Sequence, residues 1–144
     1  MIDVLLVEDD PGDVLMTREA FAHNVAASKD ANTLHVVSDG VCAMEFLHKH
    51  GPYADAPTPD LILLDLNLPR MSGREVLAAV KADPVLRQIP VIVLTTSKAV
   101  EDVRRSYQLH ANAYVTKPID FDRFIEAVRQ INEFFVDVVR LPRR

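Results

Sequence analysis

Charged and hydroxyl side chains stand where apolar runs of the chain end: Glu8, Asp9, Asp65, Thr95 and Lys117. Carboxylates brought into one crevice repel one another, and a hard divalent cation with oxygen ligands relieves that repulsion. Mg²⁺ fits best, because it binds through one or two carboxylates and keeps its other positions for water and phosphate oxygens. A lysine beside the cation would hold an incoming phosphoryl group. The chemistry this predicts is phosphoryl transfer with Asp65 as the nucleophile.

The apolar runs that carry these residues have the length and composition of buried strands. Residues 2–7, 61–64 and 91–94 are almost continuously apolar, which is typical of strands covered on both faces in a parallel sheet. Shorter strands are expected at 34–37 and 113–115. Glu8, Asp65 and Lys117 would then all lie at the carboxyl edge of the sheet.

Helical periodicity separates the expected strands. Helices are predicted to begin near Asp13, near Val41, after a Ser72 cap, near Val100 and after an Asp120 cap. Five strands alternating with five helices predict an α/β fold of the flavodoxin-like type, a doubly wound five-stranded parallel sheet in the order 2-1-3-4-5. In this order the crevice opens between strands 1 and 3, where the acidic residues meet.

Length, net charge and cysteine content limit the kinds of protein that this sequence can encode. The 144 residues suit one domain, and a 49% hydrophobic content can fill its core. A net charge of -5 argues against nucleic acid as a partner, and no apolar run is long enough to span a membrane. Cys42 is the only cysteine, and the N-terminus carries no signal-peptide pattern. We therefore expect a cytoplasmic protein without an internal disulfide.

Each candidate residue also has a simpler interpretation. An acid after a strand is most often a turn former or a helix cap, Thr95 alone would be a cap, and Lys117 alone a solvated charge. The agreement of all these positions at one sheet edge favours the functional interpretation. Asp10 and Asp39 are interpreted as turn or cap residues.

Four motifs together are similar to a known family. Residues 7–11 (Val-Glu-Asp-Asp-Pro), 64–69 (Leu-Asp-Leu-Asn-Leu-Pro), 94–97 (Leu-Thr-Thr-Ser) and 114–118 (Tyr-Val-Thr-Lys-Pro) resemble the receiver domains of two-component response regulators. The resemblance places the receiver domain at residues 1–135 and a C-terminal extension at 136–144.

The resemblance extends to a subgroup. The long loop at 51–59, the Thr-Thr-Ser run at 95–97 and the extension look most like the small regulators paired with bacterial and cyanobacterial phytochromes. No effector domain is expected after residue 135, so output would pass through protein contacts or phosphate relay.

The resemblance also implies roles for individual residues. Asp65 would accept phosphate from a phosphohistidine on a sensor histidine kinase. Asp9, Asp65 and the main-chain carbonyl of Asn67 would bind Mg²⁺, while Glu8, where many members have Asp, would act mainly through a bound water. The protein would be a phosphoacceptor that assists its own phosphorylation and dephosphorylation, and not an enzyme in the usual sense.

Two further roles concern the response to phosphate. Lys117 would hold the phosphoryl group and precede a cis peptide bond at Pro118. Thr95 and Tyr114 match the family's switch pair, in which the hydroxyl moves toward the phosphate and the aromatic ring turns inward.

Two other functions fit parts of the pattern. A phosphohydrolase of the haloacid dehalogenase class also uses an aspartate after a strand, but it normally has a second Asp where this chain has Asn67. A receiver fold that binds partners without being phosphorylated is weakened because every reactive position is present.

Apolar residues near the C-terminus predict association. The final helix is expected to turn Phe121, Phe124, Val128, Ile131 and Phe135 toward the sheet. Residues 134–141 then add further apolar side chains, which favours a homodimer. The predicted contact uses the helix near Val100, the strand at 113–115 and the final helix, and the C-terminal segment extends it.

Overall fold

The computed structural model describes residues 2–25, 33–118 and 120–134. Its strands are β1 (Asp3–Val7), β2 (Thr33–Val37), β3 (Leu61–Leu64), β4 (Val91–Thr95) and β5 (Ala113–Thr116). Its α-helices are α1 (Pro11–Val25), α2 (Gly40–His48), α3 (Gly73–Ala82), α4 (Val100–Gln108) and α5 (Phe121–Asn132). Two short 3-10 turns, η1 (Gly51–Tyr53) and η2 (Leu86–Gln88), lie in the connections before β3 and β4.

All five strands are parallel and lie in the order β2-β1-β3-β4-β5. The register pairs Val7 with Leu64 and Thr95 with Thr116, so the carboxyl ends of neighbouring strands stay level. The flavodoxin-like order predicted from the alternation of strands and helices is confirmed.

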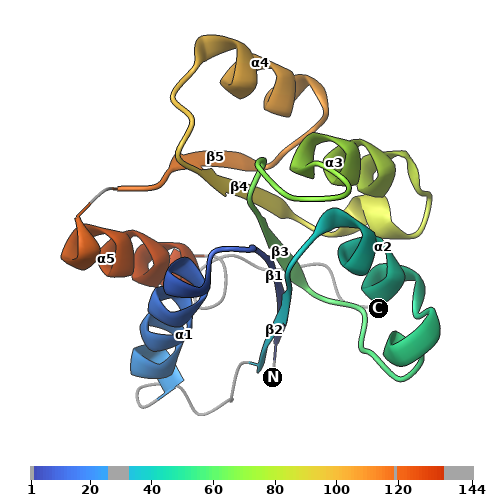
Figure 1. The fold of residues 1–144 in the computed structure, drawn as a ribbon, viewed down its shortest axis with the longest axis horizontal. Coiled ribbons are helices and arrows are strands. Elements are labelled where there is room, and N and C mark those ends of the chain that lie inside the picture. Colours follow the sequence, from blue (N-terminus) through green and yellow to red (C-terminus); the bar gives the residue numbers. More distant parts are fainter. Residues whose placement is uncertain (1, 26–32, 119, 135–144) are drawn as a thin grey trace.

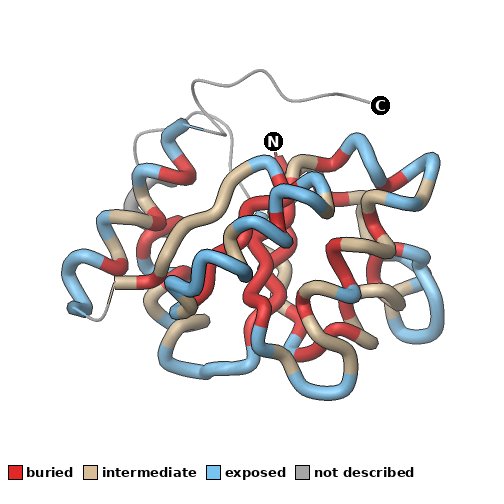
Figure 2. The backbone as a smooth tube through the Cα atoms, turned by 90° about the horizontal axis from the view of Figure 1, so that it is seen from above, coloured by how far each residue is buried: buried red, intermediate tan, exposed pale blue. Residues whose placement is uncertain are grey.

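Helices cover both faces of the sheet (Figure 1): α1 and α5 lie on one side, α2 and α3 on the other, and α4 lies at the β5 end. Leu5 and Ile62 belong to one hydrophobic core, and Leu6 and Leu63 belong to the other. Successive strand residues point to opposite faces, so a strand between two helical layers must be apolar throughout. Burial is accordingly concentrated in the central strands (Figure 2).

Polar side chains begin three of the helices as predicted. Asp39 caps α2 by accepting a hydrogen bond from the Cys42 amide at 2.7 Å. Ser72 caps α3, and Asp120 caps α5. Each of these side chains accepts from an amide that has no partner inside its helix, which is what favours Asp and Ser at helix starts.

One expectation for α5 is wrong. Phe121 is 55% exposed, whereas Phe124, Val128 and Ile131 are buried against the sheet as predicted. Phe121 is the first residue of the helix, and the stripe that faces the sheet begins one turn later. Phe135 and the extension at 136–144 lie outside the described residues.

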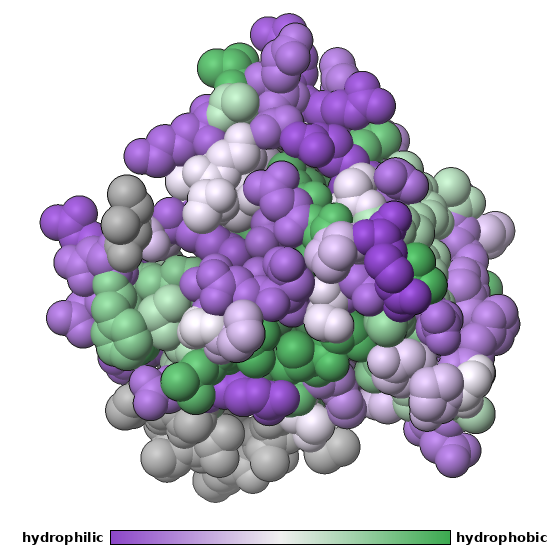
Figure 3. Space-filling view, in the orientation of Figure 1, coloured by the Kyte–Doolittle hydropathy of each residue, from purple (hydrophilic) through white to green (hydrophobic). Residues whose placement is uncertain are grey.

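The outer side of α4 is mostly hydrophilic in the space-filling view (Figure 3), where this helix forms the top of the molecule. Val100 and Tyr107 are its exposed large apolar or aromatic residues. In the described part of the chain, no helix has the length and apolar character needed to cross a membrane.

Candidate functional site

The backbone places the candidate residues at one edge of the sheet. The Asp65 amide donates to the Val7 carbonyl at 3.1 Å, and the Lys117 amide donates to the Thr95 carbonyl at 2.7 Å. These bonds continue the strand ladders by one residue beyond β3 and β5. The backbone of the first residue after each of these two strands is therefore held in the same hydrogen-bond ladder as the strand.

Three carboxylates converge at this edge. One oxygen each from Glu8, Asp9 and Asp65 can be chosen so that all lie within 4.8 Å of one another. Glu8 and Asp65 are buried, and Asp9 is exposed at the mouth of the group. A set of oxygen donors that is buried on one side and open on the other fits a hard divalent cation that keeps water in part of its coordination shell.

Lys117 lies at the centre of this acidic group. Its ammonium contacts Glu8 Oε2 closely and lies 2.9 Å from Asp13 Oδ2 and 3.0 Å from Asp65 Oδ2. The lysine side chain is only 4% exposed. A buried ammonium needs paired carboxylates, and here three of them occupy its three N–H donors.

Burial acts in opposite directions on the pKa values of Glu8 and Lys117, but both pKa values are raised in the folded protein. Burial raises the pKa of Glu8 to about 7, and the charge of Asp65 adds to the rise, although the hydrogen bond and charge of Lys117 oppose it. Burial by itself lowers the pKa of Lys117, but hydrogen bonds to Glu8 and Asp13 outweigh that effect and raise it. The lysine therefore stays charged, and the carboxylates share one positive charge between them.

The β3–α3 connection shapes the surroundings of Asp65. The Asn67 amide donates to Asp65 Oδ1 at 3.1 Å, which orients the carboxylate. Gly73, the first residue of α3, packs directly on this turn, since a Cβ there would stand 2.1 Å from the Asp65 carbonyl oxygen. The hydrogen bond places the Asn67 backbone next to the Asp65 carboxylate. Asn67 itself is exposed to solvent.

The two predicted switch residues lie on the neighbouring strands β4 and β5. Thr95 is fully buried, and its Oγ1 has no hydrogen-bond partner among the described residues. The Tyr114 hydroxyl donates to the Ser97 carbonyl at 2.8 Å. Ser97 in turn donates to Asp102, which also forms an ion pair with Arg74 of α3.

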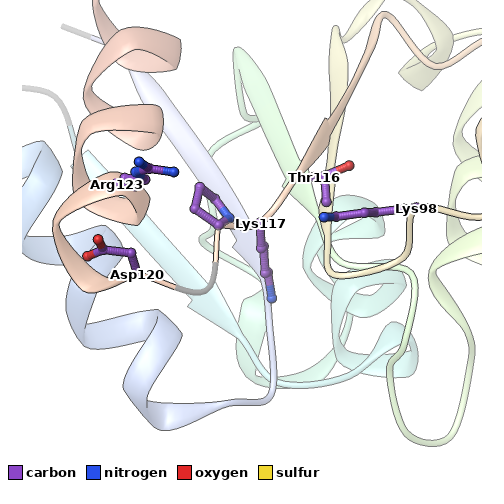
Figure 4. Close-up of a pocket in the computed structure, with 6 residues that line it drawn as sticks. Lys98, Thr116, Lys117, Asp120 and Arg123 are labelled. Atoms are coloured by element: carbon purple, nitrogen blue, oxygen red, sulfur yellow. The ribbon is translucent and has the colours of Figure 1, made fainter.

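A cavity of about 380 Å³ lies beside the acidic group, on the α5 side. In Figure 4, Arg123 and Lys98 stand on opposite sides of the chain segment that carries Lys117. The side chain of Lys117 points away from Arg123, toward the carboxylates. The cavity is lined by Lys98, Thr116, Lys117, Pro118, Asp120 and Arg123.

One member of the site and one peptide bond differ from the sequence predictions. The sequence predicts Asp13 only as a helix start, yet this residue contacts Lys117 from the first turn of α1. The sequence feature that could have indicated this contact is the position of Asp13 in the helix that directly follows β1, because that helix begins at the same sheet edge.

The expected cis bond at Pro118 is wrong: the described residues contain no cis peptide bond, and the trans form is the favoured one even before proline.

Fold and site together define an α/β domain of two-component signalling, and the chain belongs to the response regulator receiver domain family, which matches residues 4–129. That match falls inside the predicted domain at 1–135. The chain is therefore assigned to the receiver family and not to the haloacid dehalogenase class.

Within this family, the chain is similar to response regulators from cyanobacteria. The chain is 44% identical to the response regulator Rcp1 of Synechocystis sp. over 139 residues, which are 96% of this chain and 92% of Rcp1. The crystal structure of the phosphorylated cyanobacterial phytochrome response regulator RcpA has a TM-score of 0.94 at 44% identity and covers 99% of both chains. The Mn²⁺-bound form of Rcp1 has a TM-score of 0.92 at 43% identity, covering 99% of this chain and 100% of that one. The predicted likeness to phytochrome response regulators is confirmed.

Proposed function

We propose that Asp65 accepts a phosphoryl group from a phosphohistidine on a sensor histidine kinase. The observation that carries the proposal is the meeting of Lys117 with Asp65 in a buried group of carboxylates at the sheet edge. An Asp65 oxygen attacks phosphorus, the phosphohistidine nitrogen leaves, and the Lys117 ammonium balances the charge of the phosphoryl oxygens. The protein is then a phosphoacceptor that contributes to its own phosphorylation.

Mg²⁺ is the proposed cofactor. Glu8, Asp9 and Asp65 would hold it, together with the Asn67 carbonyl that the family resemblance implies. Bound there, the cation would neutralise charge on the phosphoryl oxygens. The similar protein Rcp1 has been crystallised in a Mn²⁺-bound form, and Mn²⁺ is a divalent ion with the same preference for oxygen ligands.

Thr95 and Tyr114 are the proposed conformational switch. The Thr95 hydroxyl is buried without a partner among the described residues, and a buried hydroxyl in that state gains free energy from any acceptor brought within reach. A phosphoryl oxygen on Asp65 would be such an acceptor. Movement of Thr95 would alter the β4–α4 connection, to which the Tyr114 hydroxyl is bonded through Ser97.

The phosphoacceptor assignment is tested by labelling with acetyl phosphate. Wild type should become phosphorylated with Mg²⁺ and remain unlabelled in EDTA, and Asp65→Asn should remain unlabelled in both. Asp60→Asn is the matched control, since Asp60 is at the opposite end of β3 and bonds to the Asp3 amide. Full labelling of Asp65→Asn would show that another residue is the acceptor.

The proposed kinase partner is a phytochrome, because RcpA and Rcp1 match over nearly the whole chain and RcpA is a cyanobacterial phytochrome response regulator. Output is proposed to pass through the α4-β5-α5 face. Phosphotransfer profiling against purified histidine kinases tests the partner: the phytochrome kinase should transfer phosphate fastest, and a faster transfer from an unrelated kinase would contradict the assignment.

A homodimer through the α4-β5-α5 face is also proposed. Its support is the exposure of Val100 and Tyr107 on α4 and of Phe121 on α5. Large apolar or aromatic side chains left in solvent on both helices of this face favour association. Light scattering on the full chain, with and without beryllofluoride, tests it: Val100→Asp should weaken the dimer, and a wild-type monomer in both states would refute the proposal.

A further inference from the structure

Lys117 has no N–H donor to spare. Its three contacts come from Glu8 after β1, Asp65 after β3 and Asp13 in the first turn of α1. If a phosphoryl group on Asp65 is to be held by this lysine, at least one N–H must turn away from a carboxylate. The position of the ammonium then depends on which carboxylate remains hydrogen-bonded to it.

Asp13 differs from the other two partners. Glu8 and Asp65 belong to the group of oxygens suited to a divalent cation, and Asp13 does not. Among the described residues, the Asp13 carboxylate forms a hydrogen bond only with Lys117, at 2.9 Å. Its side chain is 19% exposed, whereas those of Glu8 and Asp65 are 3% and 9% exposed.

The start of α1 holds Asp13 in place. Asp10 Oδ1 accepts from the Gly12 amide at 2.8 Å, and the Thr17 hydroxyl donates to the Asp13 carbonyl at 2.7 Å. The helix itself packs beside α5 (Figure 1). The backbone that carries this short side chain is therefore held in place. The lysine, in contrast, carries four rotatable carbon–carbon bonds whose freedom must be restrained.

We infer that Asp13 is a positioning residue for Lys117, anchoring its ammonium on the α1 side of the site while another of its N–H groups contacts the phosphoryl group. The inference rests on the proposed phosphorylation of Asp65. A cation held in the acidic group would occupy Glu8 and Asp65, and phosphorylation would change Asp65, so Asp13 is the partner of Lys117 that neither event would alter. Without it the lysine would lose its most constant anchor.

The test compares Mg²⁺ binding with binding of a phosphoryl analogue. Asp13→Asn keeps the size of the side chain and removes its charge, and Glu19→Gln is the control because it removes an exposed charge from the same helix without touching Lys117. Beryllofluoride with saturating Mg²⁺ is followed by amide NMR, and Mg²⁺ alone by calorimetry. Asp13→Asn should weaken beryllofluoride binding on the order of tenfold, as expected for loss of one charged hydrogen bond. Its Mg²⁺ affinity should stay at the wild-type value, and Glu19→Gln should change neither.

Unchanged or tighter beryllofluoride binding by Asp13→Asn would overturn the assignment, as would an equal loss of Mg²⁺ affinity. Asp13→Glu is the second variant: it keeps a carboxylate and should recover most of the beryllofluoride affinity, whereas a loss as large as that of Asp13→Asn would also overturn it. Failure of wild type to respond to beryllofluoride would instead refute the proposed phosphorylation of Asp65. The two failures are thus distinguishable.

Discussion

Replacing Lys117 by methionine tests the idea that this one cation stabilises the acidic group. The change keeps most of the alkyl stem and removes the charge. Glu8 and Asp65 are then left buried with no ion-pair partner among the described residues. Removing one partner of a buried ion pair costs about 3–5 kcal/mol of unfolding free energy, and the 4% exposure of the lysine side chain places it in that class.

Urea unfolding followed by circular dichroism measures the effect. In EDTA, Lys117→Met should lose about 3–5 kcal/mol relative to wild type. With Mg²⁺ at a hundred times its dissociation constant, about 2.7 kcal/mol should be regained, because the cation binds only the folded state. Mg²⁺ should also bind this variant more tightly than wild type, since the competing ammonium is gone.

Lys98→Met is the matched control. Lys98 is an exposed lysine that lines the neighbouring cavity and has no ion pair with a described residue. Its replacement should change the unfolding free energy by less than about 0.5 kcal/mol. A loss below about 1 kcal/mol for Lys117→Met in EDTA would refute the reasoning, because the carboxylates would then tolerate one another without the lysine.

Three further predictions concern neighbouring positions. Thr95→Val removes a buried hydroxyl without a partner among the described residues, so it should raise the unfolding free energy by about 1 kcal/mol in urea while abolishing the amide NMR response to beryllofluoride. Gly73→Ala brings a Cβ against the Asp65 carbonyl, so calorimetry should show weaker Mg²⁺ binding. Burial alone raises the pKa of Asp39, but hydrogen bonds from Arg70 and the Cys42 amide outweigh it and lower the pKa below that of an ordinary aspartate. The ion pair should therefore stabilise the fold at neutral pH and lose that contribution as pH falls through the lowered pKa; urea unfolding of wild type and Asp39→Asn should converge there.

Each of these predictions has a result that contradicts it. A Thr95→Val variant less stable than wild type would mean that the hydroxyl has a partner in solution. Gly12→Ala, whose Cβ would meet only the exposed Asp10 carboxylate at 3.3 Å, controls for Gly73→Ala, and equal effects would argue against a special contact. A stability difference between wild type and Asp39→Asn that persists in strong acid would remove the ion pair from the explanation.

The amino-acid sequence by itself determined the sheet and the main members of the site. Short continuous apolar runs such as 61–64, bounded by turn residues, are typical of strands buried on both faces, and parallel strands bring their carboxyl ends to one edge. Asp65, Glu8 and Lys117 follow directly from that rule. Each stands immediately after a strand, so a local pattern was sufficient to place it.

Tertiary structure decided what those side chains contact. The ion pair between Asp13 and Lys117 joins residues 104 positions apart, and it depends on how α1 sits against the end of β5. The exposure of Phe121 and the hydrogen bond from Tyr114 to Ser97 likewise depend on helix ends and loop paths. Periodicity reports which face of an element is buried, but contacts between the ends of different elements arise only when those elements pack together.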